Sequence, residues 1–533
     1  FIAMATVFGL VPLALAMGRR MPITNAVIAH SHRADRTFIA LALIGLAAGG
    51  IQVLNLPPFT FDDWFYVGIG SRLSEADWTT WGSAFTAHVH PTEPTLRPLT
   101  YWLLGGAFTI GGDHWWAWRL MTIATHLGAT ALLYQCGRKL TGSARAGLFG
   151  AFIWCVHPAH IEVIGWLSAI EMSWLALAYF GALAAYLHDR LLLALALTLV
   201  TFIIKEAGAT LIGAFALVDL VRFHRIRFRP LAGPVVLLAL TFVWRTAIAE
   251  PDNLAMAAYL TDMTSTPPLD FARALFITGP RIALQPFGDG VLLVAGMDVG
   301  PAVLLVAGAS LVWLAFSAAR RDQKGALTWL GFGVLWAVGI SLPAAWDMEI
   351  AQLGRPEVAP PWKLRHTYIG LAGPALAAGW LLTRSGSERR VRVVSVMAIG
   401  LCGLVFALSA GPVVNAGARS AGALAEFDQR QPSDNIGVRV IEGTDPIGLA
   451  LSYRRVISPE KPSTSVLVGE PRCGCAVPPL GPEAPGSTLR EFAEWMLAPA
   501  SITPIDPGGA CTCERWRADA RWIRYGPEGF EWD

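Results

Sequence analysis

The sequence has few charged residues for its length. Of its 533 residues, only 15% are Asp, Glu, Lys or Arg and 54% are hydrophobic, and the mean hydropathy is +0.48. A soluble globular protein carries roughly 25% charged residues, so this chain has too little polar surface to cover its apolar mass in water. The composition therefore argues against a water-soluble protein and predicts a polytopic integral membrane protein.

The chain also has no marked excess of one charge sign, and it has few lysines. The formal net charge is +2, which gives no support for a nucleic-acid partner. Only five of the 41 basic residues are lysine, which together with abundant Ala and Gly is typical of a GC-rich bacterial genome. We therefore expect the protein in a bacterial inner membrane. Because the chain begins at Phe1 and not at Met, we also expect that the start of its first apolar run is missing.

Long apolar runs recur between residues 1 and 412. A helix needs about 20 apolar residues to cross the hydrocarbon core. The predicted spans are 1–17, 37–56, 115–137, 146–164, 166–187, 191–204, 207–221, 231–249, 300–318, 326–344, 365–384 and 392–412. Two more apolar stretches, 98–111 and 273–290, are candidates for re-entrant or interfacial segments. The pattern predicts an all-α polytopic fold with about 11–12 transmembrane helices.

Basic residues cluster in alternate loops between these spans. The clusters are Arg19–Arg36, Arg138–Arg145, Arg190, Arg222–Arg229, Arg320–Lys324 and Arg384–Arg392. They all fall on one side if every predicted span is a full crossing, and basic loops are typically cytoplasmic. The opposite, exported face would then hold the loop 57–98, the turn at His157, the turn Lys205–Glu206 and everything after residue 413.

The last 121 residues differ in composition from the rest. Segment 413–533 is polar and rich in Pro and Gly, with strand-like runs at Val438–Ile441 and Thr464–Val468. We interpret it as a small exported α+β domain. It carries two C-x-C pairs, which are Cys473, Cys475, Cys511 and Cys513. In an oxidising compartment four such cysteines favour two disulfides; a zinc site is the weaker alternative because its ligands are usually spaced C-x₂₋₄-C.

The exported loop 57–98 contains two groups of ionisable residues. Asp62 and Asp63 stand between aromatic residues a few positions after the span 37–56. An adjacent carboxylate pair at an interface can include a general base, although a solvated acidic turn is the simpler interpretation. Further along, Arg97 is suited to pairing with a phosphate or a carboxylate. No cofactor is expected; a divalent metal held by His88, His90 and Glu93 is the weaker alternative.

Three later motifs fall at the exported ends of spans. The first, His157-Pro-Ala-His160-Ile-Glu162, lies where Pro158 should break a helix. The second, Lys205-Glu206, is either a local ion pair or places a cation against a phosphate. The third, Arg365-His366-Thr367-Tyr368, opens the span 365–384, either as an interfacial anchor or as a phosphate site. None of them identifies a reaction when taken singly.

The order of these motifs resembles that of a known superfamily. An acidic pair after an early span is followed by R-P-L-T, H-P-x-H-x-E, K-E and finally R-x-x-Y at a late span. This order resembles the GT-C superfamily of polytopic glycosyltransferases, especially the tetratricopeptide-linked O-mannosyltransferases and their bacterial relatives. The counterparts are Asp62-Asp63, Arg97-Pro98-Leu99-Thr100, His157-Pro158-Ala159-His160-Ile161-Glu162, Lys205-Glu206 and Arg365-His366-Thr367-Tyr368.

The resemblance covers residues 37–412 and implies three parts. These are an extra N-terminal span with a basic loop (1–36), a GT-C-like membrane domain (37–412) and an exported domain (413–533). Two features depart from the family pattern. Leu364 stands where relatives usually have an acidic residue, and a cysteine-bearing domain replaces the tetratricopeptide repeats.

The resemblance also implies a reaction. An inverting transferase would move a sugar from a polyprenyl-phosphate donor in the membrane to a hydroxyl of a protein or glycolipid acceptor. Asp62 or Asp63 would be the base, and Lys205 and Arg365 would bind the donor phosphate. The substrate-binding residues implied in addition are Arg97, His157, His160, Glu162, Glu206, His366 and Tyr368. A non-catalytic membrane scaffold is the alternative, and a transporter is less favoured because its polar groups would lie near the midplane.

Overall fold

The computed structural model describes most of the membrane domain and four strands of the tail. The described residues are 33–58, 61–86, 89, 96–248, 293–294, 297–298, 300–354, 367–385, 388–411, 414, 418, 436–440, 466–468, 521–526 and 529–532. The chain divides into two compact units. The first, called the helical unit, comprises Phe1–Leu54, Trp118–Ala247 and Met256–Val413; the second comprises Asn55–Ala117, Ile248–Ala255 and Val414–Asp533.

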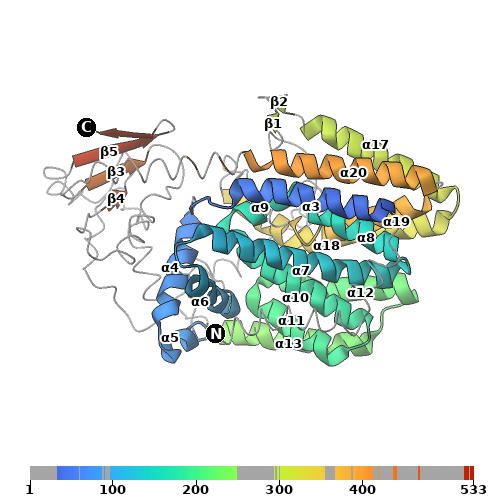
Figure 1. Cartoon of the computed structure of the whole chain (residues 1–533). Coiled ribbons are helices and arrows are strands. Elements are labelled where there is room, and N and C mark those ends of the chain that lie inside the picture. The colour runs from blue at the N-terminus through green and yellow to red at the C-terminus, as the bar shows by residue number, and fades with distance from the viewer. Residues whose placement is uncertain are drawn as a thin grey trace. The chain divides into compact units, whose positions relative to one another are not determined.

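The helical unit is built from antiparallel helices (Figure 1). Its elements are α3 (Arg33–Val53), α7 (Trp115–Thr141), α8 (Ala144–Cys155), α9 (His160–Gly165), η1 (Leu167–Ala169), α10 (Ile170–Leu187), α11 (Leu191–Ile204), η2 (Glu206–Thr210), α12 (Leu211–Phe223), α13 (Phe228–Ala247), α17 (Gly300–Ala319), α18 (Gln323–Gly354), α19 (Ala372–Arg384) and α20 (Glu388–Leu408). A short hairpin of β1 (Leu293–Val294) and β2 (Met297–Asp298) precedes α17. A predominantly helical architecture is what the long apolar runs predicted, because a helix satisfies its own backbone groups in lipid.

Burial separates a central helix from a lipid-facing layer. The apolar segment Leu167–Leu187, which contains α10, is 100% buried, whereas the segment Phe228–Arg245 in α13 is only 17% buried. Among the described residues, these two and Arg36–Val53 are long and apolar enough to cross a membrane; shorter apolar helices occur at Ala144–Cys155, Leu191–Ile204, Ala309–Ala319 and Val393–Leu408. The protein is therefore membrane-embedded around a buried α10.

Glycines let two helix pairs approach backbone to backbone. A Cβ atom built on Gly379 of α19 would lie 2.4 Å from the carbonyl oxygen of Ala146 in α8, and one on Gly150 would lie 2.8 Å from the Cα of Leu376. In a second pair, a Cβ on Gly45 of α3 would lie 2.5 Å from the Cα of Gly403 in α20. Small residues are typical of helix contacts in lipid, where close packing has to supply the attraction.

Two of the predicted spans need correction. The span predicted at 146–164 is not one helix: α8 ends at Cys155 and α9 begins at His160. Pro158 explains the break, since it lacks an N–H and its ring clashes with a helical backbone. The span predicted to open at 365 has its helix, α19, starting only at Ala372. Pro374 fits the first turn of α19, where an N–H has no partner to lose.

The remaining predicted spans either coincide with helices or lie outside the described residues. From 37–56 through 392–412 they match described helices, and the stretch 98–111 forms α6 (Pro98–Gly111) of the second unit. The segments 1–17 and 273–290 lie outside the described residues. The total number of membrane crossings stays a prediction.

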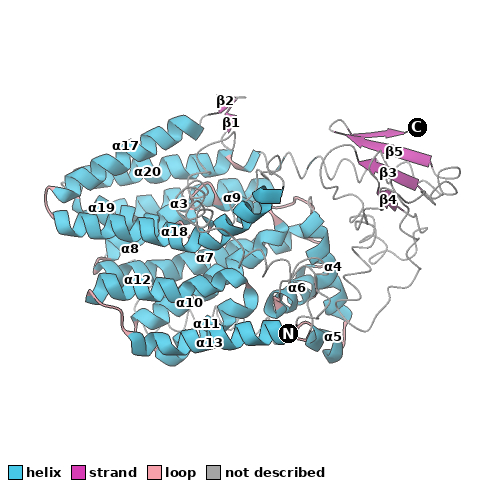
Figure 2. Cartoon of the chain, turned by 180° about the vertical axis from the view of Figure 1, so that it is seen from behind, coloured by secondary structure: helices cyan, strands magenta, loops and turns pink. Residues whose placement is uncertain are grey.

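The second unit contains a helical group and a sheet (Figure 2). The helical group is α4 (Phe61–Glu75), α5 (Trp78–Ser83) and α6. The sheet comprises β3 (Ile436–Val440), β4 (Val466–Val468), β5 (Arg521–Gly526) and β6 (Gly529–Trp532), in the order β4-β3-β5-β6. β3 pairs parallel with β4 and β5, and β5 pairs antiparallel with β6. Two of these strands overlap the predicted runs Val438–Ile441 and Thr464–Val468.

Candidate active site

Chain reversals define two ends of the helical unit. The segments 155–169, 205–210 and 367–371 lie at one end, called the histidine end, because side-chain bonds join Trp154 to Tyr368 and Lys205 to Glu171. The segments 141–144, 188–190 and 224–227 lie at the other, called the arginine end, where Arg227 contacts Asp189. The described residues of the predicted motifs in this unit gather at the histidine end. This agrees with the prediction that the motifs fall at the same ends of successive spans.

Five aromatic side chains pack together at the histidine end. This histidine cluster consists of His126 (α7), Trp154 (α8), His157, His160 (α9) and Tyr368. The ring centroids are 4.9 Å apart for His126 and Trp154, 4.8 Å for Trp154 and His160, and 4.5 Å for His160 and Tyr368. All five side chains are buried. Three separate stretches of the sequence therefore meet in one enclosed group of rings.

The hydrogen bonds of the cluster fix the turn that contains Tyr368. Nε2 of His126 lies 2.8 Å from the carbonyl oxygen of Cys155, which can only accept, so this nitrogen carries the proton. Nδ1 of His126 is then the acceptor for the Tyr368 hydroxyl. Nε1 of Trp154 donates to the Tyr368 carbonyl at 2.7 Å, and Nε1 of Trp336 donates to that of Ile369 at 3.0 Å. The turn directly after the Arg365-His366 motif is thereby held by α7, α8 and α18.

His160 differs from its neighbours in the cluster. Neither of its ring nitrogens makes a hydrogen bond with a described residue, although the side chain is fully buried. His157, in contrast, accepts a bond from the backbone N–H of Ala159 at 3.3 Å and so supports the start of α9. Glu162 is also buried in α9. A buried polar group without a partner is costly, so His160 stands out among the cluster's side chains.

Lys205 is paired across the bundle and not along the chain. It ends α11 and forms a buried ion pair with Glu171 in the first turn of α10. Glu206 instead faces Arg245 of α13 at 3.4 Å. The predicted local pair between Lys205 and Glu206 is therefore wrong. Each charge takes a partner from another helix, because adjacent residues around a helix end point in different directions.

The second unit holds the acidic pair. Asp63 lies in the first turn of α4 and its side chain is fully buried. A solvated acidic turn is therefore wrong for Asp63; the side chain of Asp62 lies outside the described part of the structure. Arg97 precedes α6 and donates from Nη1 to the Tyr66 hydroxyl of α4 at 3.2 Å. The helices pack closely there, since a Cβ on Gly105 would lie 2.8 Å from that of Leu73.

Several predicted residues lie outside the described part of the chain. They are His88, His90, Glu93, Arg365, His366, Cys473, Cys475, Cys511 and Cys513. Within the described residues, no group of three or more His, Cys, Asp or Glu could hold a metal ion. The disulfides, the phosphate-binding role of Arg365 and the export of the tail stay predictions.

Sequence reasoning missed two members of the histidine end. His126 and Glu171 lie inside the predicted spans 115–137 and 166–187, and each turned out to be the direct partner of a predicted residue. A usable signal was present. Ionisable residues within a span are costly in lipid and commonly face a functional interior, so both positions qualified as candidates before any coordinates.

Comparisons with known proteins add a sequence relationship. No protein-family model matches the chain. Among solved structures it is similar to ArnT from Cupriavidus metallidurans bound to undecaprenyl phosphate, with a TM-score of 0.44 and 14% identity over 77% of this chain and 82% of ArnT. It is also similar to the archaeal oligosaccharyltransferase AglB from Archaeoglobus fulgidus, in complex with an inhibitory peptide and a dolichol-phosphate, with a TM-score of 0.38 and 14% identity over 76% and 62% of the two chains.

A curated human protein gives the sequence match. The chain is 25% identical to Protein O-mannosyl-transferase TMTC4 of Homo sapiens in an alignment 174 residues long, and this alignment covers 26% of this chain and 22% of that protein. The chain thus spans less than a quarter of the relative that it matches. The resemblance to GT-C glycosyltransferases of the O-mannosyltransferase branch, expected from the order of the motifs, is confirmed by this match.

Proposed function

We propose that this protein is an inverting glycosyltransferase that moves a sugar from a polyprenyl-phosphate donor to an acceptor hydroxyl. The observation that carries the proposal is the sequence match to an O-mannosyl-transferase, in a chain whose motifs follow the GT-C order. The buried histidine end supports it, because ionisable groups are kept at a membrane interface mainly for function. The proposal places this chemistry on the exported face, and mannose is the first sugar to test.

The reaction needs a base and a stabilised leaving group. As the bond to the anomeric carbon breaks, that carbon gains positive character and negative charge develops on the departing lipid phosphate. Fixed cations near the phosphate stabilise this transition state more than the ground state. One base that deprotonates the acceptor hydroxyl completes a single displacement, which inverts the anomeric centre without a covalent nucleophile.

Asp63 is our stronger candidate for the base. It is fully buried in the first turn of α4, and a carboxylate removed from water is a more effective base than a solvated one. Asp62 remains the alternative. Arg97, fixed to Tyr66 in the same unit, would contact the acceptor or the donor sugar.

The histidine end supplies the donor side in this proposal. Arg365 and His366 would contact the lipid phosphate, and the turn after them is anchored by His126 and Trp154 through Tyr368. Lys205 would share its charge between the phosphate and Glu171, its partner in the free protein. His160, whose ring nitrogens make no bond to a described residue, would donate to a sugar or phosphate oxygen.

The base assignment is tested by two isosteric variants. In membranes supplied with polyprenyl-phosphate mannose, Asp63→Asn should lower sugar transfer by about 10²–10⁴-fold, the usual contribution of a general base. Asp77→Asn is the matched control. Asp77 is an aspartate of the same unit whose side chain caps α5 by accepting from the Thr80 N–H at 2.9 Å. Asn caps a helix nearly as well, so this variant should keep full activity.

The outcomes separate the base from the function. Full activity in Asp63→Asn, and also in the Asp62→Asn/Asp63→Asn double variant, would show that neither carboxylate is the base. A wild-type protein that turns over no polyprenyl-phosphate sugar from a panel beginning with mannose would overturn the transferase itself and favour the non-catalytic scaffold. Mass analysis of surface proteins and glycolipids, with and without the protein, would identify the acceptor.

A further inference from the structure

The arginine end of the helical unit concentrates cations around one histidine. Arg138 and Lys139 lie in the last turn of α7, Arg190 joins α10 to α11, and Arg222 lies in the last turn of α12. Sγ of Cys136 donates to the Phe180 carbonyl at 3.6 Å, so α7 packs beside α10. Burial first, and then the charges of the four basic residues, lower the pKa of His188, the residue that follows α10. We call His188 and these four basic residues the basic basin. They come from three separate chain reversals, so the fold and not the local sequence assembles them.

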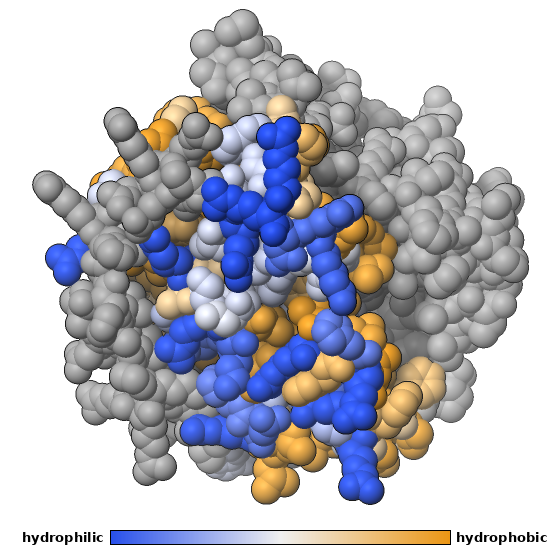
Figure 3. All heavy atoms as spheres, turned by 90° about the vertical axis from the view of Figure 1, so that its right-hand side faces the viewer, coloured by the Kyte–Doolittle hydropathy of each residue, from blue (hydrophilic) through white to orange (hydrophobic). Residues whose placement is uncertain are grey.

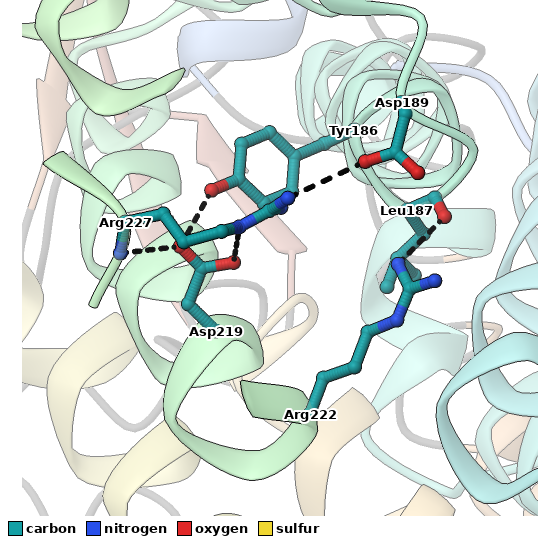
Figure 4. A network of polar contacts seen from close by, with 6 residues as sticks. All are labelled: Tyr186, Leu187, Asp189, Asp219, Arg222 and Arg227. Carbon is teal, nitrogen blue, oxygen red and sulfur yellow. Dashed lines mark hydrogen bonds and ion pairs between the residues drawn. The ribbon is translucent and has the colours of Figure 1, made fainter. Parts of the chain in front are cut away.

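The neighbouring carboxylates do not neutralise the basin. Asp219 of α12 is fully buried and accepts from the Tyr186 hydroxyl at 2.8 Å and from the N–H and Nε of Arg227 at 2.9 and 3.0 Å (Figure 4). Asp189 lies 3.4 Å from Nη1 of the same arginine. Asp219 and Asp189, the two carboxylates of segment 170–247 that lie at the arginine end, are thus both paired with Arg227. Within the described residues, none of the four basin cations forms an ion pair.

The basin has a rigid wall. Nη1 of Arg222 donates to the carbonyl oxygen of Leu187 at 3.0 Å, and Figure 4 shows its guanidinium turned toward the end of α10. The guanidinium of Arg227 lies 4.2 Å from the Phe223 ring centre and 5.3 Å from that of Tyr186. Anchored cations lose little conformational freedom when an anion arrives, so the site is prepared for binding.

Lipid-facing side chains border the cations. Leu191 and Leu192, directly after Arg190, are 45% and 86% exposed, and Phe228, directly after Arg227, is 79% exposed. Figure 3 shows hydrophilic side chains gathered over this end of the molecule, with hydrophobic ones beside them. A ligand that carries both a negative charge and acyl chains fits such a border, because its head group meets the cations while its tails cover the leucines.

We propose that the basic basin binds the phosphate head group of an anionic membrane phospholipid. Cations at helix C-termini also complement the helix dipole. That role would be filled by a separate cation at each helix end, so it does not explain why these charges gather around one histidine without carboxylate partners. The site lies at the end of the helical unit opposite the histidine cluster, and it does not depend on the proposed transferase activity. Its occupant is a lipid of the surrounding bilayer and not the sugar donor.

The test measures lipid binding to the purified full chain. Native mass spectrometry after delipidation, with phosphatidylglycerol titrated against phosphatidylcholine, should show preferential retention of the anionic lipid. Arg138→Gln/Lys139→Gln should weaken that retention about 30-fold, since each basic residue near an anionic surface contributes roughly five-fold. The matched control, Arg320→Gln/Lys324→Gln, removes two exposed cations from the turn between α17 and α18 and should leave the preference unchanged.

Three results would overturn the proposal. They are equal binding of the two lipids, equal losses in the basin and control variants, and displacement of the lipid by millimolar inorganic phosphate, which would indicate a soluble anion. If the double variant fails to fold, Arg190→Gln serves instead, because Arg190 is exposed and forms no ion pair with a described residue. An Arg190→Gln protein that binds phosphatidylglycerol as the wild type does would be a fourth result against the assignment.

Discussion

The two ends of the helical unit treat ionisable side chains in opposite ways. At the histidine end, Lys205 and Glu171 are buried together and His126 is satisfied on both ring nitrogens. At the arginine end, the four cations around His188 are partly or fully exposed and form no ion pair with a described residue, whereas Arg227 is matched by Asp219 and Asp189. A buried charge must have a partner, whereas an exposed charge near lipid head groups is stable alone. Substitutions at the two ends should therefore differ sharply in cost.

The largest effect is expected for Lys205. Lys205→Met removes the cation that pairs with the buried carboxylate of Glu171 and should lower the free energy of unfolding by about 3–5 kcal/mol. The double variant Lys205→Met/Glu171→Leu should regain most of that stability while remaining inactive, since the cation proposed for the donor phosphate is still absent. Thermal unfolding in detergent and a transfer assay would measure the two quantities.

The ion pair between Glu206 and Arg245 provides the matched control. Glu206 is 38% exposed and its contact is longer, at 3.4 Å, so Glu206→Gln should cost at most about 1 kcal/mol. A Lys205→Met protein as stable as the wild type would mean that the pair is not closely buried. It would also remove the contrast between the ends.

A smaller effect is expected within the histidine cluster. His126→Phe keeps the ring but deprives the Tyr368 hydroxyl and the Cys155 carbonyl of their partner, at a cost of about 1–3 kcal/mol. In a double-mutant cycle with Tyr368→Phe, the losses in unfolding free energy should be clearly non-additive. Tyr368→Phe removes the hydroxyl group whose hydrogen-bond partner His126→Phe has already removed. Additive losses in unfolding free energy would indicate that the two side chains do not interact.

The smallest effect should come from pH at the arginine end. Burial first, and then the charges of Lys139, Arg138, Arg190 and Arg222, lower the pKa of His188 below its ordinary value of 6.5. As pH falls below that value, the unfolded chain binds a proton before the folded one, so stability decreases. Melting temperatures between about pH 7.5 and 5.5 should show this slope, and His188→Asn should flatten it. An unchanged slope in the variant would assign the pH dependence to other groups.

Much of the helical architecture was predictable, because a run of apolar residues long enough for a membrane has few alternatives to a helix. What the sequence could not supply were partners across the bundle. Lys205 was placed correctly at a chain reversal, yet its carboxylate comes from Glu171, 34 positions earlier, and not from the adjacent Glu206. The break at Pro158 was foreseen as a turn, while the late start of α19 at Ala372 was not.

In the candidate site, too, the motif residues were predictable from the sequence but their partners on other helices were not. Motif order led to His157, His160 and Tyr368, which the fold brings into one cluster. His126 and Trp154 were not foreseen as its supports, since a single histidine or tryptophan in an apolar run does not reveal which helix it faces. Distances between helices depend on packing, and in this chain packing depends on where glycine permits contact.

The contact of α8 with α19 has a mechanical consequence. Where Gly150 and Gly379 bring the two backbones together, the helices have little room to slide, because a displacement along the axis would drive one peptide ridge over another. We expect these two helices to move as a single rod, carrying Trp154 and the Tyr368 turn with them. Any rearrangement of the helical unit would then take place around this pair of helices and not between them.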